Sequence, residues 1–220
     1  MSKTKSKKSI NEMIQILENY YPEAKCGLDY YSPLYLTISL ILAAQCTDAR
    51  VNSIMPIFFD TFKDLNGIAK ADISEIEKVI KPCGFYKNKA KNISLMSKKL
   101  IKDFNSEIPN TMEELISLNG IGRKSANIIL QECFNKSEGI AVDTHVSRTT
   151  FRMGFTNSKE PLKQEQELIK KVDKKYFNKV NHILVYHGRK ICDARKPKCD
   201  ICPVNEFCDK NGIKVKLWDN

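Results

Sequence analysis

The sequence has no hydrophobic run long enough to cross a membrane. Its longest apolar stretch, residues 34–46, contains Thr37 and Ser39 and is shorter than the roughly 20 residues that a spanning helix needs. We therefore expect a buried core helix there and no membrane partner. The basic N-terminus, MSKTKSKKSI, is followed neither by an apolar segment nor by a small-residue cleavage site. We expect no secretory signal and a cytoplasmic location.

Acidic residues are in the minority. Lys and Arg number 36 against 26 Asp and Glu, which gives a formal net charge of +10. Such a balance favours a polyanionic partner, nucleic acid first and an anionic membrane surface second. A basic protein without such a partner fits the charge equally well. Hydrophobic residues make up 42% of the 220 residues, enough for the core of one large domain or two small ones.

Alternation of apolar and polar residues, the pattern of a half-buried strand, is missing along the chain, and helical spacing takes its place. For example, Ile10, Met13, Ile14 and Leu17 recur at intervals of three and four. The sequence therefore predicts an all-α protein. We expect helices over residues 10–20, 34–46, 47–62, 72–80, 87–104, 111–118, 123–134, 144–153, 161–172 and 178–190.

Glycine is scarce, yet two of the nine glycines, Gly120 and Gly122, stand in one short string, LNGIGRK. Glycine allows backbone conformations closed to residues with a Cβ, so the string predicts a tight turn between two helices. The first N–H groups of the second helix and its dipole would bind a phosphate, reinforced by Arg123 and Lys124. This describes an anion-binding helix-hairpin-helix over about residues 111–134. A plain corner between two helices is the alternative.

Lys124 could serve as a solvated charge, a phosphate contact or a nucleophile. Taken alone, phosphate contact is favoured, because an amine with a reference pKa of about 10.4 is almost fully protonated at neutral pH. A nucleophilic lysine needs a proton acceptor nearby. Asp143, in the string AVDTHVSR, is a candidate. By itself Asp143 reads more simply as the N-cap of a helix, and His145 as a structural histidine.

Four of the eight cysteines lie close together near the C-terminus with the spacing C-x6-C-x2-C-x5-C. They are Cys192, Cys199, Cys202 and Cys208. In a reducing compartment such a group predicts a metal centre. The spacing matches neither two zinc knuckles nor the common ferredoxin patterns, so zinc and iron-sulfur both stay open. Ligation would stiffen a loop that carries Arg195, Lys196 and Lys198, which then could contact phosphates or simply offset the thiolate charge.

These strings together resemble a known family. LNGIGRKSANIIL, AVDTHVSR and HGRKICDARKPKCDICPVNEFC are similar, in order and spacing, to the endonuclease III family of DNA glycosylases with associated lyase activity. AAQCTD and CGFYKNKAKNI resemble two further stretches of that family, so the match spans nearly the whole chain after the basic tail. The resemblance implies a [4Fe-4S] cluster on the four C-terminal cysteines. It also implies a cluster domain formed by residues 1–25 and 138–220, a six-helix domain formed by residues 26–137, and DNA lying across a cleft between them.

The same resemblance assigns roles to residues. Lys124 corresponds to the family's Schiff-base lysine and Asp143 to its catalytic aspartate. Gln45 resembles the residue that fills the space left in the duplex, and Phe85 stands where the family places a bulky wedge. DNA contacts are also expected from the hairpin and the cysteine loop, at Gly120, Gly122, Arg123, Arg195, Lys196 and Lys198. The implied function is a bifunctional base-excision repair glycosylase that removes oxidised pyrimidines and nicks the strand by β-elimination.

The sequence departs from the family at two points. Asn119 stands where the family often has proline, which should loosen the hairpin, and one extra residue lies near NKSEG. One alternative function is a mismatch-specific monofunctional glycosylase, although such relatives generally lack this lysine and carry an added domain. The other is a non-catalytic, metal-stabilised DNA-binding protein. We expect a monomer that binds double-stranded DNA containing damaged bases or abasic sites.

Overall fold

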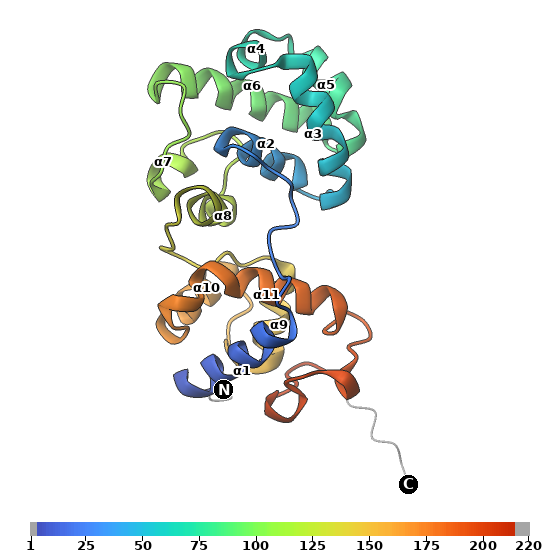
Figure 1. The fold of residues 1–220 in the computed structure, drawn as a ribbon, viewed down its shortest axis with the longest axis vertical. Helices are drawn as coiled ribbons and strands as arrows, with labels where there is room; N and C mark the ends of the chain where they lie inside the picture. The colour runs from blue at the N-terminus through green and yellow to red at the C-terminus, as the bar shows by residue number, and fades with distance from the viewer. Residues whose placement is uncertain (1–3, 214–220) are drawn as a thin grey trace. The chain divides into compact units, whose positions relative to one another are not determined.

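The computed structural model describes residues 4–213, and the regular structure within that range is entirely helical (Figure 1). The predicted all-α class is confirmed. The α-helices are α1 (Lys7–Tyr20), α2 (Pro33–Ala43), α3 (Asp48–Phe62), α4 (Leu65–Lys70), α5 (Ile73–Ile80), α6 (Tyr86–Asp103), α7 (Met112–Ile116), α8 (Arg123–Phe134), α9 (Thr144–Met153), α10 (Pro161–Lys171) and α11 (Phe177–Lys190). Short 3-10 turns are η1 (Lys81–Cys83), η2 (Lys174–Tyr176), η3 (Cys199–Ile201) and η4 (Asn205–Phe207).

The helices form two compact units. Unit 1 takes its described residues from Met1–Lys25 and Ser137–Asn220, and unit 2 is Cys26–Lys136. Unit 1 is therefore built from both ends of the chain, whereas unit 2 is continuous.

Helix α2 is the centre of unit 2. It begins at the predicted apolar stretch, with the Ser32 hydroxyl capping its N-terminus and Pro33 in its first turn. Eight of its residues, from Tyr35 to Leu42, are buried, and α3, α6 and α8 pack around it. The prediction of a core helix is thus confirmed, but the helix ends at Ala43 and not at residue 46. The next three residues form a loop that carries Gln45.

Most helix starts in unit 2 follow from capping chemistry. The Thr47 hydroxyl accepts a hydrogen bond from Arg50 N at the start of α3, and Asp72 with Glu75 forms a capping box at the start of α5. Helix α6 differs, because its N-cap, Phe85, has a left-handed backbone and no side-chain cap. Helix α4 was not predicted from the sequence.

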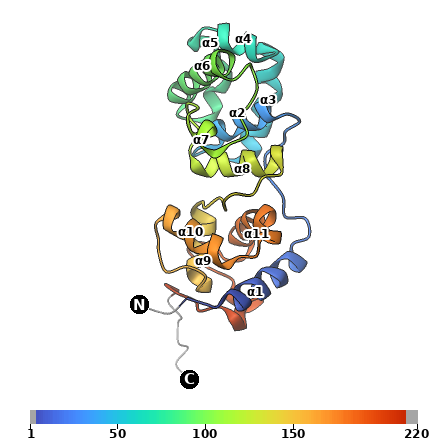
Figure 2. The ribbon, with the colours of Figure 1, turned by 90° about the vertical axis from the view of Figure 1, so that its left-hand side faces the viewer.

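In unit 1, α1 packs against α10 and α11. Figure 2 shows α1 running below α11. The predicted apolar face of α1 is buried there, since Ile10, Met13, Ile14 and Leu17 are at most 1% exposed. Polar contacts add to this packing. Asn11 Nδ2 donates to the carbonyl of Lys171 at 2.9 Å. The N-terminal helix is therefore part of the core of unit 1.

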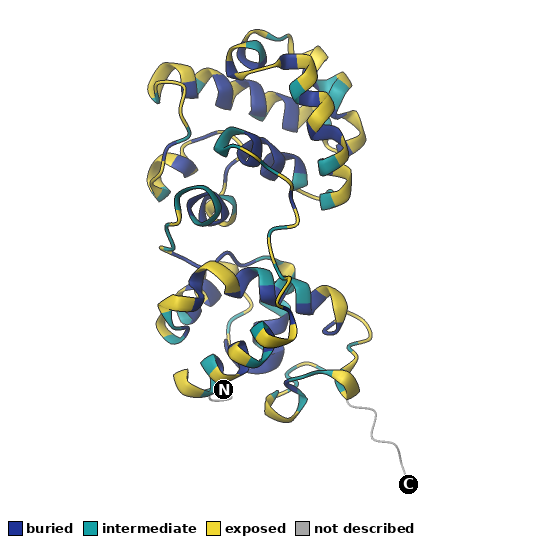
Figure 3. Cartoon of the chain, viewed as in Figure 1, coloured by how far each residue is buried: buried dark blue, intermediate teal, exposed yellow. Residues whose placement is uncertain are grey.

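Buried residues line the inward sides of the helices in each unit, and exposed residues lie on the outer sides (Figure 3). Within residues 4–213, no helix is both long enough and apolar enough to cross a membrane.

Candidate functional site

The predicted helix-hairpin-helix is formed by α7, the connecting residues 117–122 and α8. The turn is closed by a hydrogen bond from Ile121 N to the carbonyl of Leu118 at 3.1 Å, and both side chains are buried. Helix α8 begins at Arg123, and Ala126 N donates to the carbonyl of Gly122 at 2.9 Å. The N–H groups ahead of Ala126 have no acceptor within their own helix, as at any helix start.

The two glycines of the hairpin do different things. Gly120 has a φ of +83°, and a Cβ there would lie 3.1 Å from the Cβ of Asn92 and 3.3 Å from Ile41. Gly122 has a φ of −99°, and a Cβ on it would meet open space. The expectation that both positions need glycine for the turn is therefore wrong for Gly122. What Gly122 provides is an uncovered backbone at the start of α8.

Lys124 lies in the first turn of α8 and is exposed, as is its neighbour Arg123. The hairpin thus presents an amine, a guanidinium and the first N–H groups of α8 on one helix end. Such an end attracts phosphate through the helix dipole and through charge.

Gln45 and Phe85 share an unusual backbone. Both are exposed and both have positive φ, +54° for Gln45 and +47° for Phe85, a region that residues other than glycine rarely occupy. Phe85 is 67% exposed although it is a large apolar residue. Backbone strain of this kind persists only where the surrounding structure enforces it, and it clusters at functional sites.

The fold of unit 2 brings three predicted DNA contacts together. Gln45, Phe85 and Gly120 line one pocket of about 200 Å³, although they are separated by up to 75 residues in the sequence. Lys89 and Asn92 of α6 also line it. A pocket of about 830 Å³ lies along α1 in unit 1, but its lining includes none of the predicted site residues.

Asp143 is the N-cap of α9. Its Oδ1 accepts hydrogen bonds from His145 N and Val146 N, both at 2.8 Å. The prediction that Asp143 caps this helix is confirmed, and the two hydrogen bonds fix the orientation of its carboxylate. Within the described part of the chain no hydrogen bond to Oδ2 accompanies these, so that oxygen can accept a proton or face a positive centre. His145 is half-buried, and its Nδ1 lies 3.1 Å from Arg148 Nη2.

The four C-terminal cysteines line one common pocket in unit 1, together with Met153, His187 and Ile191. Their sulfurs are not gathered at a single point: among residues 4–213 no three His, Cys, Asp or Glu side chains are grouped to hold one metal ion. A four-iron cluster takes one thiolate on each iron, so its ligands stand farther apart than those of a single ion. The donor set therefore fits such a cluster.

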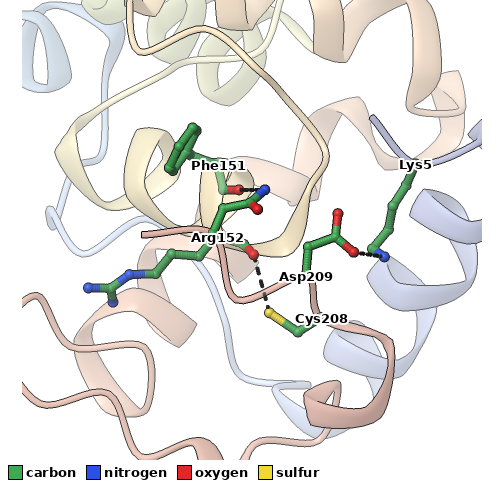
Figure 4. Close-up of polar contacts among 6 residues, drawn as sticks. Lys5, Phe151, Arg152, Cys208 and Asp209 are labelled. Carbon is green, nitrogen blue, oxygen red and sulfur yellow. Dashed lines mark hydrogen bonds and ion pairs between the residues drawn. The ribbon is translucent and has the colours of Figure 1, made fainter. Parts of the chain in front are cut away.

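Two buried side chains support the sulfurs. Arg152 Nη1 lies 3.4 Å from Cys192 Sγ and 2.6 Å from the carbonyl of Asp193. The carbonyl of Arg152 accepts from Cys208 Sγ at 3.4 Å, as Figure 4 shows. His187 Nε2 lies 3.8 Å from Cys202 Sγ, and burial lowers the pKa of this histidine to about 4. Neutral imidazole and guanidinium N–H groups suit thiolate acceptors. Neither Arg152 nor His187 was predicted from the sequence to support the cysteines.

The loop between Cys192 and Cys199 carries the predicted basic residues. Arg195, Lys196 and Lys198 are all exposed there. The loop has a fixed turn, because the Asp193 carboxylate accepts hydrogen bonds from the backbone N–H groups of Arg195 and Lys196. These two bonds lower the pKa of Asp193. The cations are thus displayed on an ordered backbone.

Comparison with known proteins defines the class. Residues 38–174 match the model of the HhH-GPD superfamily of base excision DNA repair proteins, and residues 192–208 match that of the iron-sulfur binding domain of endonuclease III. The helix-hairpin-helix and the cysteine loop are thus parts of a DNA-repair fold that holds an iron-sulfur cluster.

Relatives matched over most of their length identify the family within this class. Endonuclease III of Synechocystis sp. is 41% identical over 92% of each chain, and that of Bacillus subtilis is 36% identical over 94% of this chain and 97% of its own. A solved structure of a trapped endonuclease III–DNA covalent intermediate matches with a TM-score of 0.89 and 34% identity, covering 94% of this chain and 97% of that one. The chain belongs to the endonuclease III family of DNA glycosylases with lyase activity at abasic sites.

Proposed function

We propose that this chain removes oxidised pyrimidines from double-stranded DNA and then nicks the strand at the resulting abasic site, with Lys124 as nucleophile and Asp143 as its proton acceptor. The observation that carries the proposal is the hairpin, which presents an exposed lysine on an anion-binding helix end. The solved relative trapped as a covalent intermediate with DNA supports a nucleophilic residue in the family.

The reaction begins with extrusion of the damaged nucleotide, because a stacked base hides its glycosidic bond. The neutral amine of Lys124 then attacks C1′ of the sugar. The N–C1′ bond forms, the glycosidic bond breaks, and the base leaves with the bonding electron pair. The Asp143 carboxylate takes a proton from the amine and stabilises positive charge on the sugar.

The lyase step follows from the covalent product. Ring opening gives an iminium, which makes the C2′ proton acidic. Loss of that proton forms a C1′–C2′ enamine, and expulsion of the 3′ phosphate with the C3′–O electrons breaks the strand. Water then hydrolyses the Schiff base and frees Lys124.

The remaining predicted residues would hold the DNA. Gln45 would occupy the gap left by the extruded nucleotide, and Phe85 would wedge beside the opposite strand. Both side chains are exposed, and both residues have a positive φ. Such strain would relax unless the surrounding structure enforced it, and enforced strain clusters at functional sites, which supports this assignment. The cations of the hairpin and of the cysteine loop would contact phosphates.

The iron-sulfur cluster, held by Cys192, Cys199, Cys202 and Cys208, would fix the basic loop, because metal binding contributes directly to folding of its ligand segment. We further propose that unit 1 is the cluster domain and unit 2 the hairpin domain, that the protein acts as a monomer, and that it acts on chromosomal DNA.

Borohydride trapping on a duplex with one abasic site tests the proposal. Wild-type protein should form a covalent complex. Lys124→Ala should abolish it while changing DNA affinity less than about tenfold, because one phosphate-facing cation among several is lost. The matched control is Arg123→Ala, the adjacent exposed cation, which should weaken binding but still allow trapping at saturating protein.

Two outcomes would contradict the proposal. A wild-type protein that binds DNA and is never trapped would be a non-catalytic DNA-binding protein. Trapping that survives Lys124→Ala would move the nucleophile elsewhere. A panel of duplexes, each with one lesion, would then define substrate choice, and release of adenine from a mismatch in place of an oxidised pyrimidine would favour a mismatch glycosylase.

A further inference from the structure

Lys89 is a buried cation that has no role in the proposed chemistry. It lies in the first turn of α6 and is only 4% exposed, in a helix whose other lysines are mostly on the surface. Burial of an ammonium is costly unless hydrogen bonds compensate for lost water.

The Lys89 ammonium joins the ends of two helical segments. Its Nζ donates to the carbonyl of Leu42 at 2.9 Å and to the carbonyl of Cys83 at 2.9 Å. Leu42 is in the last turn of α2, and Cys83 is the last residue of η1. Carbonyls at helix ends lack intrahelical donors and carry the negative end of the dipole, so a cation suits them.

Each of these carbonyls stands just before a strained, exposed residue. Gln45 follows Leu42 by three residues, and Phe85 follows Cys83 by two. The backbone N–H of Lys89 also donates to the carbonyl of Phe85 at 3.2 Å. One residue therefore ties the loop that carries Gln45 to the loop that carries Phe85, at the pocket that all three line.

We infer that Lys89 is a positioning residue for DNA interrogation: its buried ammonium sets the spacing between the Gln45 loop and the Phe85 loop, so that both side chains enter the duplex together. This inference rests on the proposed function, because it assumes that the two loops probe DNA. Desolvation lowers the pKa of Lys89, and the nearby thiols of Cys46 and Cys83 act in the opposite direction.

Lys89→Met tests the inference, since it keeps most of the chain length and removes every N–H donor. Release of an oxidised pyrimidine from a duplex, measured in single turnovers, should slow about 100-fold, the scale expected for a misplacement of about 1 Å. Nicking of a preformed abasic site should slow less than about fivefold, because no stacked base has to be extruded. Covalent trapping on abasic DNA should persist, since Lys124 is intact.

Three comparisons make the result specific. Lys98→Met, at an exposed position of the same helix, removes the same charge and should leave both reactions unchanged. Lys89→Arg should recover base release to within about tenfold of wild type, because a guanidinium can donate to both carbonyls. A 2-aminopurine placed beside the lesion should brighten when wild-type protein binds and should stay dim with fully bound Lys89→Met protein.

The inference is wrong if Lys89→Met slows both reactions equally or slows neither. If Lys89→Met does not fold by circular dichroism, Lys89→Gln takes its place with the same expected ratio, since its shorter amide cannot reach both carbonyls. A wild-type protein that cannot be trapped on abasic DNA would overturn the proposed function and this inference together. Equal behaviour of wild type and variant in a working enzyme would overturn the positioning role alone.

Discussion

Gly120 and Gly122, two residues apart in one turn, show how different the demands on single positions can be. Two features of Gly120 require a residue without a Cβ: its left-handed backbone and its close approach to Asn92 and Ile41. Gly122 has neither feature. The two glycines therefore look alike in the sequence, but only Gly120 is required by the conformation and packing of the turn.

Alanine substitutions should separate the two positions. Gly120→Ala should lower the free energy of unfolding by about 2 kcal/mol, from a left-handed non-glycine residue and a tight Cβ contact. Gly122→Ala should cost less than about 1 kcal/mol but should weaken DNA binding, because its methyl group would stand where a phosphate approaches. Urea unfolding and fluorescence anisotropy measure the two effects. Equal destabilisation by both variants would contradict this account.

Single residues were also the hardest part of the site to foresee. The sequence identified Lys124 and Asp143 as candidates because each stands in a distinctive string, and their catalytic roles stay predictions. The burial of Lys89 could not be predicted, because a lysine in a basic helix is typical of the surface. Its ammonium is held by the carbonyl of Leu42, which is distant in the sequence. The positive φ of Gln45 and Phe85 likewise has no marker in residue type.

At the scale of elements, the helices were largely predictable because their starts carry capping residues. Helix α9 has the predicted bounds, Thr144–Met153, with Asp143 as its cap, and α8 likewise runs from Arg123 to Phe134. Helix α4 was missed because it has six residues, one of them Gly67, too few to show helical periodicity. Helix α2 ends earlier than its apolar run, since hydrophobicity marks burial and does not mark where a helix stops.

Helix α9 supports the cysteine loop through Arg152. The guanidinium donates to the carbonyls of Cys192, Asp193 and Ala194 as well as to Cys192 Sγ. It thereby provides donors for carbonyls that follow the end of helix α11 and lie outside any regular secondary structure. Arg152 therefore anchors the backbone of the loop that carries the ligands to helix α9.

Arg152→Met should release this anchor. The carbonyls of Cys192, Asp193 and Ala194 would lose their donor. This loss should cost about 2 kcal/mol of unfolding free energy, and the iron content per protein should fall. The exposed Arg195 provides the control, because Arg195→Met leaves those carbonyls bonded and should keep full iron content. Metal analysis and the visible absorbance of the purified protein measure the result. Full iron loading in Arg152→Met would show that the cysteines alone order the loop.

At the scale of the whole molecule, the net charge of +10 favours association with polyanionic DNA. Each phosphate neutralised by the protein releases counterions, so log affinity falls linearly with log salt concentration. Affinity for undamaged duplex should accordingly fall steeply between low and physiological salt. The charge is not concentrated in one run of sequence, so several surfaces should share this dependence.

Lys196→Gln should reduce the magnitude of the salt slope by about 1, since one phosphate contact is lost. Lys98→Gln, which removes the same charge from an exposed position on α6, should leave the slope unchanged. Anisotropy titrations at several salt concentrations provide both slopes. Equal slopes for Lys196→Gln and wild type would exclude the cysteine loop from the DNA contacts.

The discontinuous composition of unit 1 has a consequence for synthesis on the ribosome. Helix α1 emerges first, but the helices that bury its apolar face, α10 and α11, are translated more than 140 residues later. Unit 2 is complete by Lys136 and can fold in the interval. A nascent chain stalled at that point would therefore carry one finished body and an orphan amphipathic helix, a natural target for chaperones.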